Sequence, residues 1–250
     1  MSSTPTSDGG TAMLLEVSGL ESGYGKLTVL HGVDFVADAG EVVSILGPNG
    51  AGKSTLMKTI AGHLPAKSGQ VNLKGERIDG QDPFHVARSG VGYVPQDNNV
   101  FGDMTVLENL EVGSLSLGRN SSNLIEAVFE RFPILRERRQ QRASTLSGGE
   151  RQTLAVSSAL ITGSDLLLLD ETSAGLAPKF VEEIVRWIVE VAAQGTAVVW
   201  VLEQNPEPVL EISNRTYLMD AGRIREEMQS SELLEPGRLE EVLLEDHPTA

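Results

Sequence analysis

The feature that most constrains the fold of this chain is a glycine-rich loop between a strand-like and a helix-like segment. Residues 47–55 read Gly-Pro-Asn-Gly-Ala-Gly-Lys-Ser-Thr and fit the pattern G-x-x-x-x-G-K-[ST]. The preceding residues 41–46 form a short apolar run, and residues 53–61 have helical periodicity. A strand that turns through glycines into a helix predicts an α/β fold, with a mostly parallel sheet covered by helices.

This loop has the chemistry of a phosphate-binding site. Glycines let backbone N–H groups wrap the β-phosphate, and the following helix offers its positive N-terminal end. Lys53 supplies a charge to the β- and γ-phosphates, and the Ser54 hydroxyl is placed for Mg²⁺. The alternative, a glycine-rich turn with a chance lysine, is disfavoured by the flanking strand and helix. The residues expected to hold the nucleotide are Gly47, Pro48, Asn49, Gly50, Ala51, Gly52, Lys53, Ser54 and Thr55.

A second element is an acidic pair at the end of an apolar run. Four leucines at 166–169 are followed by Asp170 and Glu171. Nucleotide sites in open α/β sheets lie at the carboxyl edge of the strands, where this pair would be placed. We expect Asp170 to serve Mg²⁺, directly or through a water, and Glu171 to polarise the attacking water. Without the loop, such a pair would be no more than a solvated strand end.

A third element, residues 146–152, reads Leu-Ser-Gly-Gly-Glu-Arg-Gln. Ser147 lies at the expected N-cap of a helix, and Gly148 and Gly149 expose N–H groups, which makes a second anion site. Residues 47–55 already satisfy the chain's own triphosphate, so this second site fits nucleotide held by another copy or a partner. Taken alone, the segment could be only a well-capped helix.

Together these elements resemble the ATP-binding subunits of ABC transporters, with residues 146–152 as the signature, over about residues 13–226. The resemblance implies a P-loop NTPase cassette with a RecA-like parallel-sheet core, an N-terminal antiparallel β subdomain and an inserted helical subdomain at about 104–150. It implies ATP and Mg²⁺ as cofactors. It also implies that Tyr24 stacks on adenine, and that Gln96 touches Mg²⁺ or the attacking water and moves with a transmembrane partner.

The chain departs from the general family pattern at three positions. Thr172 follows the acidic pair where many members have proline, Ala177 stands at the position of an aspartate, and Gln204 replaces the switch histidine. A glutamine cannot become cationic, but its amide can donate to a γ-phosphate oxygen. Alternatively, Gln204 only closes the strand at 196–202. The segments that resemble one subgroup, the second ATPase subunit of branched-chain amino-acid importers, are 24–33, 100–110, 175–178 and 203–205.

Composition limits the partners. The 35 acidic and 20 basic residues give a net charge of −15, which repels nucleic acid, so no nucleic-acid partner is expected. The chain has no cysteine, which fits a reducing cytoplasm. Its longest apolar runs fall far short of the roughly 20 residues that cross a membrane. The resemblance implies a cytoplasmic subunit on the inner face of the membrane, joined to a second ATPase subunit (identical or related), transmembrane permease subunits and, indirectly, a solute-binding protein.

The expected elements extend over most of the chain. Residues 1–12 are polar and small and are expected to be a disordered extension; residues 227–250 are expected to be an acidic tail. Core strands are expected at 91–94, 166–170 and 196–202, and shorter antiparallel strands at 14–17, 33–36 and 71–73. Helices are expected at 105–112, 123–131, 150–160 and 179–193.

The function that these features predict is ATP hydrolysis that energises an ABC importer for branched-chain amino acids. One alternative is an importer ATPase for another small solute. Another is a soluble, non-transport ABC protein acting on ribosomes or DNA-repair assemblies, but such proteins carry two cassettes or long coiled-coil insertions, and no heptad run is present here. A non-hydrolysing regulator is disfavoured by Glu171.

Overall fold

The fold is built from two β-sheets with a helix between them. The structure, a computed structural model, describes residues 13–97, 99–114, 122–172, 176–203 and 205–244. The predicted disordered extension at 1–12 and Gln204 therefore lie outside the described residues. Within the described residues, no helix combines the length and apolar character needed to cross a membrane.

The N-terminal sheet is antiparallel, as predicted. Its order is β2-β1-β4-β5, formed by β1 (Met13–Tyr24), β2 (Leu27–Asp38), β4 (Ala66–Leu73) and β5 (Glu76–Arg77). The strands are longer than the apolar runs at 14–17, 33–36 and 71–73, because the hairpin continues through polar, partly exposed residues. Register shifts such as the one between Val17 and Leu20 interrupt the apolar alternation that would have marked its full length.

The second sheet contains the predicted parallel core. Its order is β10-β9-β3-β8-β7-β6, and β3, β6, β7, β8 and β9 run parallel, while β10 pairs antiparallel with β9 at the edge. The core strands fall within one residue of the expected positions: β3 (Val42–Leu46), β6 (Val91–Val94), β7 (Leu166–Asp170) and β8 (Ala197–Leu202). In this sheet, the sequence analysis did not predict β9 (Arg215–Asp220) and β10 (Arg223–Gln229).

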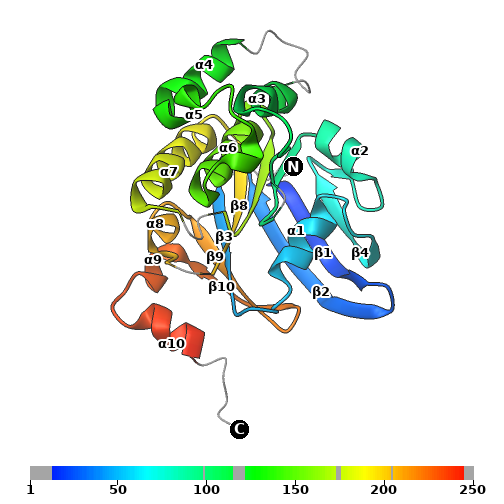
Figure 1. The fold of residues 1–250 in the computed structure, drawn as a ribbon. Coiled ribbons are helices and arrows are strands. Elements are labelled where there is room, and N and C mark those ends of the chain that lie inside the picture. The colour runs from blue at the N-terminus through cyan, green and yellow to red at the C-terminus, as the bar shows by residue number, and fades with distance from the viewer. Residues whose placement is uncertain (1–12, 98, 115–121, 173–175, 204, 245–250) are drawn as a thin grey trace, which may run out of the picture.

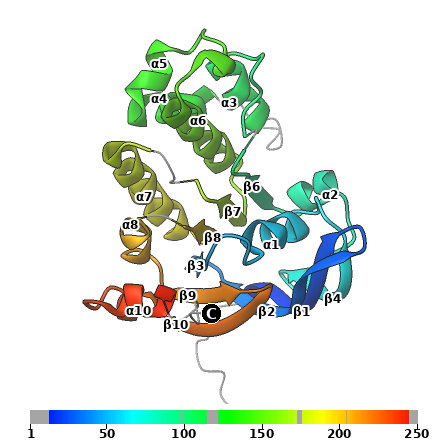
Figure 2. The same cartoon turned by 60° about the horizontal axis from the view of Figure 1, so that its bottom comes forward.

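Both faces of this sheet are covered, which explains its continuous apolar strands. Along β8, Val199 packs with α1 (Lys53–Ile60) and the antiparallel sheet, whereas Trp200 packs with the helices of the opposite face. Figure 2 shows α1 lying between the two sheets. The helix that carries Lys53 is therefore fixed on both sides, and its N-terminus is held at the carboxyl edge of β3.

The helical subdomain is present where the sequence predicts it. Figure 1 shows its helices gathered at one end of the molecule, away from β1 and β2. It comprises α3 (Val106–Ser114), α4 (Ser122–Arg131), α5 (Pro133–Glu137), a 3₁₀ turn at Ala143–Thr145 and the first part of α6 (Gly148–Ile161). Because α6 ends just before β7, it joins this subdomain to the core. The remaining helices of the first 210 residues are α2 (Pro83–Arg88), α7 (Pro178–Ala192) and α8 (Glu207–Leu210).

The sequence analysis expected an acidic tail from residue 227 onward. The described part of this segment is instead folded onto the core. The expected boundary falls inside β10, and two short helices follow, α9 (Ser230–Leu233) and α10 (Arg238–Leu244). Met228, Leu233 and Val242 are buried in the same core as Trp200. Acidic composition concealed this packing because the few buried apolar side chains of the segment are irregularly spaced among exposed residues.

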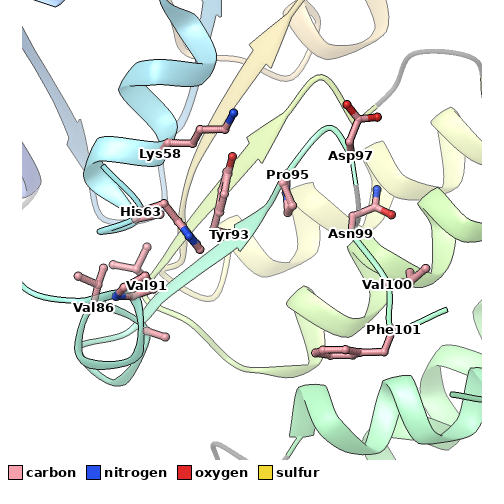
Figure 3. Close-up of a pocket in the computed structure, with 13 residues that line it drawn as sticks. Lys58, His63, Val86, Val91, Tyr93, Pro95, Asp97, Asn99, Val100 and Phe101 are labelled. Carbon is pink, nitrogen blue, oxygen red and sulfur yellow. The ribbon is translucent and has the colours of Figure 1, made fainter. Parts of the chain in front are cut away.

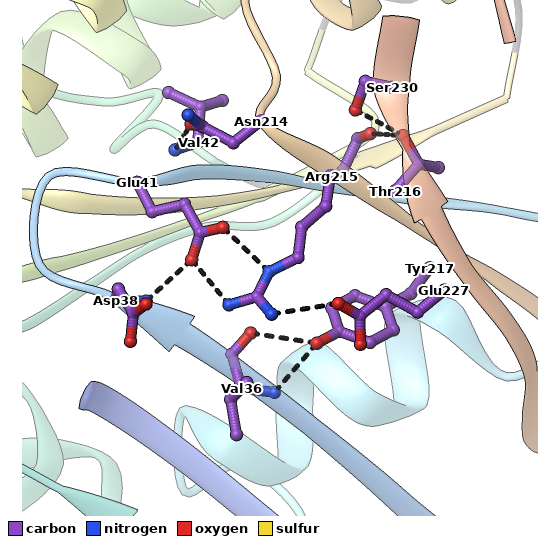
Figure 4. Close-up of polar contacts among 11 residues, drawn as sticks. Val36, Asp38, Glu41, Val42, Asn214, Arg215, Thr216, Tyr217, Glu227 and Ser230 are labelled. Atoms are coloured by element: carbon purple, nitrogen blue, oxygen red, sulfur yellow. Dashed lines mark hydrogen bonds and ion pairs between the residues drawn. The ribbon is translucent and has the colours of Figure 1, made fainter. Parts of the chain in front are cut away.

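A partly buried ion-pair network ties this C-terminal segment to the start of β3 (Figure 4). The Arg215 guanidinium donates hydrogen bonds to Glu41 Oε2 at 2.8 Å and to Glu227 Oε1 at 3.0 Å, and its Nε lies 2.8 Å from Glu41 Oε1 as part of the ion pair. Behind it, a chain of hydroxyl groups runs from Ser44 through Thr216 to Ser230, with distances of 2.7 and 2.8 Å. Three segments far apart in the sequence are thus joined at the edge of the sheet opposite the phosphate-binding loop.

We expect Arg215→Ala to lower the free energy of unfolding by about 2–4 kcal/mol, because it leaves Glu41 without its bidentate partner in a site where both side chains are less than one-fifth exposed. Urea unfolding measures the change. Arg186→Ala is the matched control, since the Arg186 side chain is 62% exposed and its pairs with Glu182 and Glu183 are worth about 0.5 kcal/mol or less. Equal losses in the two variants would contradict a structural role for the Arg215 network.

Candidate nucleotide-binding site

Parallel pairing gathers the candidate site at one edge of the sheet. In register, Leu46 of β3 lies beside Leu202 of β8, and Asp170 of β7 lies beside Val201 of β8. The loop that follows β3 and the acids that follow β7 and β8 therefore emerge side by side. β6 adds Gln96, two residues beyond its end at Val94.

Two glycines shape the phosphate-binding loop. Gly52 precedes α1 with a φ of 105°, in the left-handed region that favours glycine. A Cβ added to Gly47 would lie 2.0 Å from the carbonyl oxygen of Met219 in β9, so this glycine allows the loop to pack directly on the sheet. The N-terminus of α1 carries no side-chain cap. Its N–H groups are thus directed at the space where an anion would bind.

Lys53 is held inside this loop. Its side chain is buried, and Nζ donates to the carbonyl oxygens of Gly47 at 2.6 Å and Pro48 at 3.0 Å. Burial lowers the pKa of Lys53, and the carboxyl groups of Glu171, Glu203 and Asp170 oppose that shift. Phosphate oxygens can replace the two carbonyl acceptors, which gives Lys53 the charge and position that the sequence predicts.

Asp170 and Ser54 form the part of the site that suits a magnesium ion. Asp170 is almost fully buried, and its Oδ1 accepts a hydrogen bond from Ser54 Oγ at 2.9 Å. Its Oδ2 accepts from the hydroxyl of Tyr93 at 3.3 Å. Among the described residues, no group of three or more His, Cys, Asp or Glu side chains is arranged so that it could hold a metal ion by itself. One carboxylate and one hydroxyl fit Mg²⁺, which takes few protein oxygens and completes its shell with phosphates and waters.

Glu171 lies in a strained and buried position beside this pair. Its φ of 53° is rare for a residue with a side chain, as is typical of functional sites. Gln96 Nε2 donates to Glu171 Oε2 at 2.6 Å. Burial and, after it, the neighbouring carboxyl of Glu203, which lies within hydrogen-bonding reach, raise the pKa of Glu171 to about 7. A carboxylate with this pKa is suited to accept a proton near neutral pH.

A cavity of about 410 Å³ brings most of the predicted residues together. It is lined by Tyr24, residues 49–55, Gln96 and Glu171, with Leu27 and Val29. Tyr24 is about half exposed at this cavity and can present its ring to a base. This volume is in the range of small-ligand sites.

The predicted signature residues do not line this cavity. Ser147 is the N-cap of α6: its Oγ accepts from the N–H of Glu150 at 3.3 Å, and Glu150 Oε2 accepts from the N–H of Ser147 at 2.8 Å. The capped-helix reading of this segment is thus correct for the structure of the single chain. An added Cβ at Gly148 would meet nothing within 4 Å, and one at Gly149 only a Leu176 side-chain atom. The start of α6 is therefore open to an approaching group.

Glu203 and Tyr93 were missed as site residues by the sequence analysis. Glu203 Oε1 accepts a hydrogen bond of 2.5 Å from Asn49 Nδ2 at the tip of the phosphate-binding loop. It follows an apolar strand just as Glu171 does, so the argument that located Glu171 could have located it. Tyr93 lies inside a strand, where an aromatic residue indicates only packing.

A second cavity, of about 550 Å³, lies beside the loop of Gln96 (Figure 3). We call it the β6 groove. It is lined mainly by apolar groups, including Tyr93, Pro95 and Phe101, and is bounded by α1 and α2. Phe101 is more than half exposed at its rim. Pro95 and Asp97, the neighbours of Gln96, both face this groove, so the same loop contributes to the groove and to the nucleotide cavity.

This arrangement defines a P-loop nucleoside-triphosphatase. A strand leads into a glycine-rich loop that holds a lysine, a helix begins directly after the loop, and a carboxylate stands at the end of the next strand but one in the sheet. The family model of the ABC transporter matches residues 30–174. The chain belongs to this family, and it has the fold of its ATP-binding cassettes.

Relatives and solved structures agree with this assignment. The "Probable branched-chain amino acid transport ATP-binding protein LivF" of Archaeoglobus fulgidus is 38% identical over 92% of this chain and 98% of its own length. The "High-affinity branched-chain amino acid transport ATP-binding protein BraG" of Pseudomonas aeruginosa is 40% identical over 80% of this chain and 86% of its own. A crystallised ATP-binding cassette of an ABC transporter in its ADP conformation is similar with a TM-score of 0.75 and 27% identity, covering 92% of this chain and 98% of that one. The predicted family and fold class are confirmed.

The raised pKa of Glu171 predicts a pH dependence of ATP hydrolysis. Because only the unprotonated carboxylate can accept a proton, kcat/KM for ATP should rise with pH through about 7 and level off above it. Glu203→Gln keeps an acceptor for Asn49 but removes one of the charges that raise this pKa, so the rising limb should move to lower pH. Steady-state ATPase assays from pH 5.5 to 9 would measure it.

The control is Glu207→Gln, which removes the same charge from an exposed residue at the start of α8. It should leave the profile unchanged. A limb that stays in place in Glu203→Gln would show that Glu203 does not act on Glu171.

Proposed function

We propose that this chain binds MgATP in the cavity of the phosphate-binding loop and hydrolyses it to energise an ABC importer of branched-chain amino acids. The observation that carries the hydrolytic part is two hydrogen bonds, Ser54 to Asp170 and Gln96 to Glu171, in which Ser54, Gln96 and Glu171 line the same cavity. The first contact suits a magnesium ion and the second a water molecule. When bound, Mg²⁺ supplies positive charge that offsets the charge of the phosphates.

The reaction is phosphoryl transfer from ATP to water. The oxygen of water forms a bond to the γ-phosphorus, the bond to the ADP oxygen breaks, and Glu171 accepts the proton of the water. Gln96, which already contacts Glu171, orients that water. Lys53 and the N–H groups at the start of α1 stabilise the charge that develops on the phosphate oxygens. We assign to Gln204 the donation of a hydrogen bond to the γ-phosphate, on the family resemblance alone.

The second ATPase subunit completes the site. Ser147, Gly148 and Gly149 lie outside the chain's own cavity, and the space in front of Gly148 is open. We assign these residues to the nucleotide that is bound by a partner cassette, identical or related, whose own signature would cover the nucleotide of this chain. ATP binding then draws the two cassettes together.

Transport is inferred from the relatives and from the β6 groove. Both relatives described above are transport ATP-binding proteins for branched-chain amino acids by name. The groove has an apolar lining, an exposed Phe101 at its rim and the Gln96 loop as a wall, and we assign it to a segment of a transmembrane permease subunit. The chain would then lie on the inner face of the membrane. A solute-binding protein would act only through the permease.

We expect Ser147→Arg to abolish ATP-driven association and hydrolysis while the chain still binds ATP in its own cavity. The arginine would fill the space into which the partner's nucleotide must enter. Light scattering for association and a fluorescent ATP analogue for binding separate the two effects.

Loss of the N-cap costs about 1 kcal/mol of stability in any case, so a matched control is needed. Thr105→Ala removes an equivalent cap from α3, where Thr105 Oγ1 accepts from the N–H of Glu108 at 3.2 Å. It should lose similar stability and keep its ATPase activity. Full hydrolysis by Ser147→Arg, or by a demonstrated monomer, would contradict the completion of the site by a partner.

The solute class is tested by reconstituting the chain with the membrane proteins that co-purify with it. Proteoliposomes containing ATP should accumulate leucine, isoleucine or valine with the wild-type chain and not with Glu171→Gln, which should bind ATP normally and turn over at least about 100-fold more slowly. Uptake of a different solute would correct the substrate and leave the ATPase intact. An active ATPase with which no membrane protein co-purifies would favour the non-transport alternative.

A further inference from the structure

The carboxylate of Asp170 accepts hydrogen bonds from two side chains that belong to different elements of the fold. Oδ1 accepts from Ser54 at the start of α1, at 2.9 Å, and Oδ2 accepts from the hydroxyl of Tyr93 in β6, at 3.3 Å. Asp170 itself is 1% exposed. With the bond from Ser54 alone, the carboxyl group could still rotate about its terminal bond; with both, its plane is fixed.

Tyr93 reaches Asp170 from the neighbouring strand. It is paired with Leu168 of β7, two residues before Asp170, and its side chain packs on the side of the sheet that α1 covers. Figure 3 shows its ring at the wall of the β6 groove, beside His63 and with its hydroxyl on the side of Lys58. The centroids of the Tyr93 and His63 rings are 5.5 Å apart.

The hydroxyl of Tyr93 is a permanent donor. Burial raises its pKa well above the ordinary value of 10, and the charge of Asp170 raises it further. A phenol hydroxyl donates and a carboxylate oxygen accepts, so the hydrogen bond runs from Tyr93 to Asp170. Phenylalanine would fill the same space against His63, so the hydroxyl is not needed for packing.

We propose that Tyr93 is a positioning residue of the magnesium site: its hydroxyl fixes the Asp170 carboxylate in the orientation that presents Oδ1, together with Ser54 Oγ, to the ion. This inference rests on the proposed binding of MgATP. Groups that hydrogen-bond a metal-binding side chain in this way typically change metal affinity by about 10-fold to 100-fold when removed. A distance of 3.3 Å is long for such a contact, so the lower end of that range applies.

The test is Tyr93→Phe in the full-length chain, with Mn²⁺ as the probe for Mg²⁺. Electron paramagnetic resonance titration of Mn²⁺ in the presence of ADP should give a dissociation constant for the ion about tenfold higher in Tyr93→Phe than in the wild type. Binding of ADP in EDTA should be unchanged, because the loop and α1 are untouched. The Mg²⁺ concentration that half-saturates ATP hydrolysis should rise by a similar factor.

Tyr217→Phe is the matched control. Tyr217 is also a buried tyrosine whose hydroxyl contacts the protein, at 3.4 Å from the backbone of Val36, but it lies in the Arg215 network far from Asp170. It should leave Mn²⁺ affinity unchanged. The comparison separates the general effect of removing a buried tyrosine hydroxyl from the specific effect of removing the one that contacts Asp170.

Two results would overturn the inference. One is wild-type Mn²⁺ affinity in Tyr93→Phe; the other is an equal loss of ADP binding with and without the ion, which would mean a damaged fold. Asp170→Ala distinguishes failure of this inference from failure of the proposed function. If Asp170→Ala lowers Mn²⁺ affinity and Tyr93→Phe does not, only the role of Tyr93 is wrong. If neither the wild type nor any variant binds Mn²⁺ with ADP, the proposed MgATP site fails, and the inference with it.

Discussion

The hydrogen bond between Ser54 Oγ and Asp170 Oδ1 depends on almost every other part of the fold. Ser54 is placed by α1, which is held between two sheets, and Asp170 is the last residue of β7. The strands that precede these residues, β3 and β7, are not neighbours but are both paired with β8. A shift of one residue in either pairing would turn Asp170 to the opposite face and put an aliphatic side chain in its place. The pairing register of three apolar strands therefore determines whether these two polar atoms meet.

This placement concentrates negative charge in the site. Around the one buried ammonium group of Lys53 lie the carboxyl groups of Asp170, Glu171 and Glu203. Burial is the main cause of the raised pKa of Glu171, and repulsion by the carboxyl groups of Glu203 and Asp170 adds to it. A triphosphate brings still more negative charge. Its binding therefore requires the dipole of α1, the loop N–H groups and a divalent cation together, which explains why a negatively charged protein has so local a polyanion site.

The sequence predicted those parts of the site whose residues directly follow a recognisable strand in the chain. The loop at 47–55 and the acids at 170–171 each follow an apolar strand directly, so their place at the sheet edge comes from one rule. Tyr93 could not be found in this way, because its contact with Asp170 depends on the pairing of β6 with β7. The packing of residues 228–242 was missed for a related reason: three inward side chains among many acids leave no clear periodicity. The rule that located Glu171, an acid directly after an apolar strand, would also have located Glu203.

The start of α6 has the properties of a binding site for an anion that the chain's own cavity does not contain. An acid in the first turn of a helix normally offsets the positive N-terminal end, and Glu150 occupies that position. Its carboxylate, however, is bonded to the N–H of Ser147 and paired with Arg138 at 2.8 Å, so its charge is already balanced. The helix end thus keeps its attraction for an anion, while the space in front of Gly148 stays open and the chain's own cavity is lined by other residues. A helix end with these properties fits the proposed arrangement, in which two cassettes face each other across a nucleotide.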